Sequence, residues 1–165
     1  MALTYEKIET KTISSAQASV TFSSIPATYT DLVLITNGKM VSGGGENSLG
    51  IQLNGDTGSN YSSVAFYGAG TTPGSSLRFN NGVELYVARM GHSTNTTSII
   101  HLLDYSNTTT YKTVLARGAS SAVIMTTAGS WRNTGAVNSV LVRGFGLFAN
   151  FASGCTFTLY GIKAA

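Results

Sequence analysis

Apolar and polar side chains alternate with a period of two residues along most of this chain. Ala18, Val20 and Phe22, for example, are separated by the polar residues Ser19 and Thr21. Successive side chains of a strand point to opposite faces, so this alternation is typical of strands that bury one face. The same pattern recurs in segments 49–53, 83–87, 111–115, 123–125, 139–142 and 156–160. Helical periodicity is nearly absent, and the pattern predicts about nine or ten short strands.

Two segments are apolar without alternation, Leu32 to Ile35 and Ile99 to Leu103. Continuous apolar runs of this length are typical of strands that are covered on both faces. We expect the opposite sheet to cover one face of each strand. Either a partner subunit or a long loop is expected to cover the other.

Clusters of Ser, Thr, Asn and Gly separate the predicted strands, at 42–48, 68–76, 91–97 and 106–109. The pair Asn54-Gly55 is a strong hairpin-turn signal. Short strands bounded by such turns indicate an all-β sandwich or barrel. We expect a single domain over residues 1–165, built as a jelly-roll-like antiparallel β-sandwich.

Charged residues make up only 10% of the chain, whereas a typical soluble protein has about 25%. Ser and Thr together supply about a quarter of the residues, so hydroxyl groups provide much of the polar surface. A weakly charged surface of this kind favours broad contact with neighbouring subunits. The net charge of +3 is spread from end to end without a basic run, which argues against a nucleic-acid partner.

The N-terminal residues lack the apolar core of a signal peptide, and the longest apolar run is far too short to cross a bilayer. We therefore expect synthesis in the cytoplasm and no membrane partner. Cys155 is the single cysteine, so no disulfide can form within the chain. Its expected role is that of a small apolar side chain buried in the last strand.

Residues that could carry catalysis or bind a metal are few and scattered. The two histidines are His92 and His101, and in a strand His101 and Asp104 would point to opposite faces. No Gly-x-Ser-x-Gly turn offers a nucleophile. Oxygen-bearing side chains alternate from Asn54 to Asn60 as in a calcium loop, but Ala65 stands where that loop needs a bidentate acid. We predict a hairpin turn there, and no enzymatic activity, metal or cofactor.

Trp131 is the only tryptophan and is followed by Arg132. An exposed aromatic ring beside a cation can stack on a sugar, so these two residues are the candidate glycan contacts. The competing interpretation is that Trp131 fills one end of the sandwich, and the sequence favours it.

Four stretches of the sequence, taken together in their order and spacing, identify a kind of protein more specifically than any one of them does alone. They are Met1-Ala-Leu-Thr-Tyr-Glu-Lys-Ile8, Phe22-Ser-Ser-Ile-Pro-Ala-Thr-Tyr-Thr-Asp-Leu-Val-Leu34, Ile51-Gln-Leu-Asn-Gly-Asp-Thr-Gly-Ser-Asn-Tyr-Ser62, and a C-terminal stretch from Trp131 that ends in Thr158-Leu-Tyr-Gly-Ile-Lys163. The chain resembles, over both ends and much of the middle, a loosely defined family of small virion proteins of tailed bacteriophages, especially phages of cyanobacteria. Cys155 stands where this family more often has Ser.

The resemblance implies a non-enzymatic virion protein with a jelly-roll-like fold that is often multimeric. We rank a capsid decoration (cement) protein first, with the major capsid protein and its own copies as partners, as a homotrimer at local three-fold positions. A tail or fibre-associated structural protein that contacts other tail proteins and binds a receptor or glycan ranks second. A carbohydrate-binding module ranks third. The expected location is the virion.

A cement protein needs a rigid sandwich and apolar patches that are buried on assembly. Aromatic and large aliphatic residues are enriched at such contacts. The candidate interface residues are Tyr5, Ile8, Tyr29 and Tyr67.

Overall fold

The computed structural model describes residues 4–41, 47–120, 123–145 and 150–163. These residues form twelve strands in two antiparallel sheets. The strands are β1 (Tyr5–Thr12), β2 (Ser19–Phe22), β3 (Asp31–Gly38), β4 (Asn47–Leu53), β5 (Tyr61–Ala69), β6 (Thr72–Gly82), β7 (Leu85–Met90), β8 (Thr96–Leu103), β9 (Lys112–Ala119), β10 (Val123–Trp131), β11 (Val140–Phe145) and β12 (Thr156–Ile162). No helix long and apolar enough to cross a bilayer occurs within these ranges.

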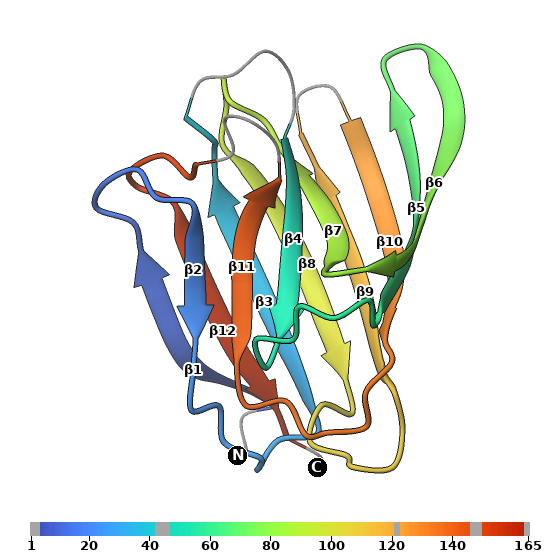
Figure 1. Ribbon diagram of the computed structural model, residues 1–165. Helices are drawn as coiled ribbons and strands as arrows, with labels where there is room; N and C mark the ends of the chain where they lie inside the picture. The colour runs from blue at the N-terminus through green and yellow to red at the C-terminus, as the bar shows by residue number, and fades with distance from the viewer. Residues whose placement is uncertain (1–3, 42–46, 121–122, 146–149, 164–165) are drawn as a thin grey trace.

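The larger sheet has eight strands in the order β1-β12-β3-β8-β9-β10-β5-β6, and the smaller has four in the order β2-β11-β4-β7. Figure 1 shows the smaller sheet lying across one face of the larger. The predicted all-β antiparallel sandwich is therefore confirmed. The chain passes from one sheet to the other several times, so strands distant in sequence become neighbours, as β1 and β12 do.

The core lies between the sheets and is built by the alternating residues of both. From the smaller sheet, Phe22, Ile51 and Val142 are buried, and from the larger sheet Ile100 and Leu159 face them. Other buried members include Leu34, Leu53, Leu85, Met125, Tyr61, Tyr105 and Phe157. Cys155 is also buried, as predicted.

The two continuous apolar segments differ from each other. Leu32 to Leu34 is buried throughout, and Val33 is only 2% exposed although it lies on the face turned away from the smaller sheet. Its neighbours in register are Tyr160 of β12 and His101 of β8. Further along the two strands, the register partners Ile35 and Ile99 are both only half-buried. Side chains of the same sheet therefore cover Val33, whereas the side chain of Ile99 remains partly exposed to solvent.

A turn forms at Asn54-Gly55, where both residues have positive φ, 53° and 66°, and the backbone N–H of Asp56 donates to the carbonyl of Leu53 at 3.0 Å. The predicted hairpin is wrong, because β4 and β5 on either side of this turn belong to different sheets. The region predicted as a long loop at 68–76 is instead largely strand, because β5 continues to Ala69 and β6 begins at Thr72. The far end of this hairpin stands clear of the smaller sheet (Figure 1).

Candidate binding face

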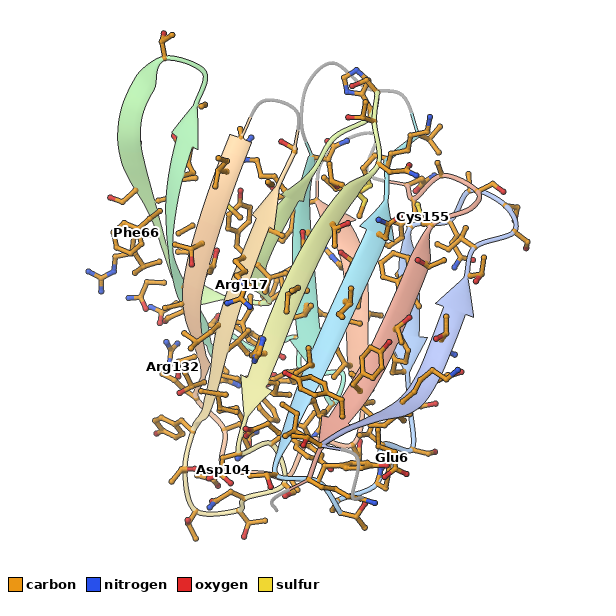
Figure 2. The ribbon with its side chains drawn as sticks, turned by 180° about the vertical axis from the view of Figure 1, so that it is seen from behind. Glu6, Phe66, Asp104, Arg117, Arg132 and Cys155 are labelled. Carbon is orange, nitrogen blue, oxygen red and sulfur yellow. The ribbon has the colours of Figure 1, made fainter. Side chains whose placement is uncertain are left out.

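The outer face is the face of the eight-stranded sheet that is turned away from the smaller sheet, and it carries large apolar side chains in contact with solvent. Ile124 is 72% exposed, Phe66 57% and Leu115 46%. They belong to three neighbouring strands, β10, β5 and β9. Figure 2 views the sandwich from this side, with Phe66 and Arg117 on it. Clusters of exposed apolar residues on a soluble protein commonly mark contact sites.

Strand register orders these side chains into rows that run across the sheet. One row consists of Thr158, Ile35, Ile99, Arg117, Thr126, Phe66 and Ser76. The next row consists of Thr156, Asn37, Thr97, Ala119, Ile124 and Gly68. Aliphatic groups and hydroxyls therefore lie side by side over several strands, as the composition led us to expect of the surface.

A groove of about 1080 Å³ crosses these rows beside the β5–β6 hairpin. Its lining residues come from β5, β6, β8, β9 and β10: Phe66, Tyr67, Gly68, Gly74, Ser75, Ser76, Thr97, Ile99, Arg117, Gly118, Ala119, Ile124, Met125 and Thr126. Arg117 is the only charged residue among them. The hairpin forms one wall, and the central strands form the floor.

The outer face is positively charged. Lys7, Arg78 and Arg117 occupy its rows, at β1, β6 and β9. Asp31, the first residue of β3, places a carboxylate on this face. Its Oδ1 accepts a hydrogen bond from the backbone N–H of Asp104 at 2.7 Å, so it is held at the sheet end. The field over the central strands favours an anionic partner.

The structure places Trp131 in the interior, which corrects its role as a candidate glycan contact. Its side chain is 1% exposed, and its ring stacks on that of Tyr61 with centroids 6.3 Å apart. Its indole N–H donates to Asp56 Oδ2 at 2.7 Å. Neither face of the ring is open to a sugar. Trp131 is therefore a space-filling residue of the interior, which is the interpretation that the sequence favoured.

Arg132 is half-buried and holds the base of the β5–β6 hairpin. Its Nη2 donates to the carbonyl of Ser59 at 2.6 Å and to Asn81 Oδ1 at 2.9 Å, and its Nη1 donates to Ser62 Oγ. Ser62 in turn donates to Asn80 Oδ1 at 2.7 Å. The guanidinium group is therefore engaged by several hydrogen bonds. These bonds hold the base of the β5–β6 hairpin, which forms one wall of the groove.

The calcium-like stretch from Asn54 to Asn60 is a connection between the two sheets and not the predicted hairpin, and Asp56 stabilises it from within. Its Oδ1 accepts from the N–H of Gly58 at 2.8 Å, and its Oδ2 accepts from the amide of Asn60 at 2.9 Å. Partial burial would raise the pKa of Asp56, but the hydrogen bonds from Trp131, Asn60 and Gly58 outweigh it and hold the pKa below its usual value.

The four candidate interface residues do not form one patch. Tyr5 is exposed on β1 and meets Tyr160 edge-to-face, with centroids 6.3 Å apart. Ile8 and Tyr29 are half-buried against the core near the same sheet edge. Tyr67 is half-buried at the opposite end of the sheet, under the guanidinium of Arg89, and lines the groove.

The exposed residues of the outer face were not identified from the sequence. In β10, the outward set Ile124, Thr126 and Ala128 is almost as apolar as the inward set around Met125. Alternation alone therefore leaves open which set faces solvent. The sequence carried one sign of this exposed face. A strand of a half-buried sheet normally has apolar residues on one face, whereas this strand has them on both.

Titratable residues do not gather into a metal site: among the described residues no group of three or more His, Cys, Asp or Glu is close enough to hold an ion. His101 lies on the outer face, half-buried, between Val33 and Leu115 in register. Asp104 lies in the turn after β8 with a positive φ of 49°. His101 therefore lies within β8 on the outer face, whereas Asp104 lies in the turn that follows the strand.

No family model matches this sequence, and no curated protein matches it. Among solved structures, the chain is similar to the alginate lyase Aly36B with 8% identity and a TM-score of 0.33, covering 93% of this chain and 77% of that one. A variant of that lyase in complex with alginate tetrasaccharide gives 6% identity and a TM-score of 0.31, covering 98% and 75%. A protein of unknown function from Shewanella oneidensis gives 10% identity and a TM-score of 0.24, covering 98% and 77%. Likeness at this level carries no inference about what this chain does.

Proposed function

We propose that this chain is a non-enzymatic structural protein of a phage virion, and that it decorates the capsid and stabilises the head through contacts between subunits. The observation that carries the proposal is the outer face, where Ile124, Phe66 and Leu115 are exposed together on adjacent strands. The virion setting is supported by the sequence resemblance to small phage proteins.

The chemistry of the outer face suits a broad protein contact. Fully burying an exposed Phe, Ile or Leu side chain stabilises a complex by about 1.5–3 kcal/mol. Leu115, Phe66 and Ile124 are already partly covered, so each supplies somewhat less. Thr126 lies among them and Thr97 on the adjoining strand β8, and their hydroxyl oxygens can accept hydrogen bonds across an interface without the desolvation cost that buried charges carry.

A buried lysine ties together two connections at one end of the framework behind this face. Lys112, at the start of β9, is completely buried. Its Nζ donates to the carbonyls of Asn107, Thr110 and Thr134 at 2.7, 2.8 and 3.1 Å. This ammonium group fastens the β8–β9 and β10–β11 connections together. A protein that reinforces a shell needs such internal bracing, because load must pass from one face of the sandwich to the other.

The proposed partners are the major capsid protein and further copies of this chain, arranged as a trimer. The second candidate is a tail or fibre-associated structural protein with a receptor or glycan-binding role. The burial of Trp131 removes the residue on which its sugar contact was predicted. The outer face supports head and tail contacts alike, so the experiment must separate them.

The proposal is tested by adding the recombinant chain to heads from a phage that lacks it. The wild-type chain should bind to saturation at a fixed number of copies per head. Phe66→Asp should weaken binding about tenfold or more, because a carboxylate replaces an apolar side chain that becomes buried. Thr21→Asp places the same charge on the outward side of β2 in the smaller sheet and should bind like wild type. Failure of the wild-type chain to bind heads, or binding only to tails, would reject decoration.

A further inference from the structure

The groove beside the β5–β6 hairpin combines an apolar floor with one cation. We propose that it receives an extended segment of a neighbouring coat subunit, in which an apolar side chain lies two residues from a carboxylate. Arg117 binds the carboxylate, and Ile124 and Phe66 hold the apolar group. This inference rests on the proposed function, since it names the chemistry of the partner at the same face.

The spacing of the groove residues fits such a segment. Thr126 is the register partner of both Arg117 and Phe66, so these two side chains lie two strands apart. Ile124 is two residues along β10 from Thr126, which makes it a diagonal neighbour of Arg117, at roughly 7–8 Å. Residues i and i+2 of an extended chain lie on one side and about 6.6–6.8 Å apart. An acid and an apolar residue at that spacing can therefore reach both sites together.

Arg117 is exposed on the groove floor, and no ion pair to it occurs within the described part of the chain. A guanidinium binds a carboxylate through two parallel hydrogen bonds, which fixes orientation as well as charge. Lys7 and Arg78 lie four and three strands away on the same face, beyond a Debye length of about 8–10 Å, so Arg117 supplies the charge that a partner meets in the groove. Charge complementarity thus points to an acidic partner.

The lining favours a polypeptide over a polysaccharide. Asn, Gln, Asp and Glu side chains are absent from it, and its polar side-chain groups are Arg117 and the hydroxyls of Thr, Ser and Tyr67. A sugar ring exposes several hydroxyls around its edge, and carboxylates and amides are the side chains that pair with adjacent hydroxyls. An apolar anchor beside a single carboxylate needs only what this groove contains.

Gly68 offers a way to close the groove without disturbing the core. It lies in β5 beside Ile124, and a Cβ added to it would meet no heavy atom within 4 Å. Its φ lies outside the left-handed region, so a larger residue fits the backbone. Gly68→Leu should therefore fold normally and fill the space that the partner segment would occupy.

The test is a methyl NMR titration of the recombinant chain with two peptides, acetyl-Gly-Leu-Thr-Glu-Gly-amide and its Gln analogue. We expect the Glu peptide to shift the methyl signals of Ile99 and Ile124, and to bind about fivefold more tightly than the Gln peptide, as one exposed ion pair allows. Arg117→Gln should abolish this preference. Gly68→Leu should abolish binding of both peptides while its amide spectrum stays folded. Lys39→Gln, which removes one positive charge outside the groove, should behave like wild type.

Three results of the titration would overturn the inference. One is the absence of any methyl shift at millimolar peptide, and another is equal binding of the Glu and Gln peptides by the wild-type chain. The third is tighter binding of trigalacturonate at the same methyls, which would make the groove a site for acidic sugars. Head binding separates this inference from the proposed function. If the Arg117→Gln and Gly68→Leu variants decorate heads like wild type, the groove assignment fails and decoration stands.

Discussion

The indole N–H of Trp131 and the carboxylate of Asp56 are joined by a hydrogen bond of 2.7 Å. This bond links the end of β10 to the turn between β4 and β5, although the two residues are 75 positions apart. The same carboxylate accepts hydrogen bonds from Gly58 and Asn60. One side chain thus closes a turn and fixes the only tryptophan inside the sandwich.

Asp56→Asn should lower the free energy of unfolding by about 1–3 kcal/mol at neutral pH, because one oxygen acceptor becomes an amide donor facing other donors. The pKa of Asp56 is held below its usual value, so its stabilising effect is complete above that usual value and is lost as pH falls through the folded-state pKa. Urea unfolding at about pH 7 and about pH 3 should show a gap between wild type and variant that shrinks in acid. Asp104→Asn, in an exposed turn, is the control. A gap that is unchanged in acid would contradict this account.

Lys112→Met should destabilise the protein by roughly 2–4 kcal/mol, since the buried ammonium group is lost and three partly buried carbonyls lose their donor. Lys7→Met makes the same chemical change on the exposed edge strand β1 and should cost less than about 0.5 kcal/mol. Thermal unfolding of both variants measures the difference. Equal effects would show that the buried ammonium group is not a brace.

Lys112 also shows why the fold could be predicted and the binding face could not. Alternation along β9 places Lys112 and Leu115 on opposite faces. A rule that buries apolar residues would turn Leu115 inward, yet the charged residue is inside because carbonyls from two connections satisfy it. The kind of element follows from local patterns, although twelve strands form where about nine or ten were predicted. The buried side of a strand with apolar residues on both faces depends on distant partners. The groove needs the register of five strands, which no local pattern contains.

Glu84→Gln should alter the pH dependence of stability. Burial raises the pKa of Glu84, and Arg143, whose Nε lies 2.8 Å from its carboxylate, offsets this only in part. A group with a raised folded-state pKa stabilises the fold fully below its unfolded pKa of about 4.3, and this contribution is lost as pH rises through the folded-state value. Relative to the variant, wild type should therefore lose stability between about pH 4 and neutrality. Parallel stability curves for the two proteins would be evidence against a desolvated carboxyl group.

Two glycines of the larger sheet should respond oppositely to alanine. At Gly161 in β12 an added Cβ would overlap the ring of Tyr29, whereas at Gly68 in β5 it would meet nothing. Gly161→Ala should cost about 1–3 kcal/mol through overpacking, and Gly68→Ala should be neutral or slightly stabilising. Chemical denaturation of both variants provides the measurement. Similar losses would mean that the packing of Tyr29 over Gly161 is not tight.

The most direct test of the account is cryo-microscopy of an intact particle that contains this chain. We predict density for the two-layer sandwich at the junctions of coat subunits on the head, with Phe66, Ile124 and Leu115 turned toward a neighbouring subunit. Density in which the outer face of the eight-stranded sheet points into solvent would contradict the contact role, and density at the tail alone would contradict decoration of the head.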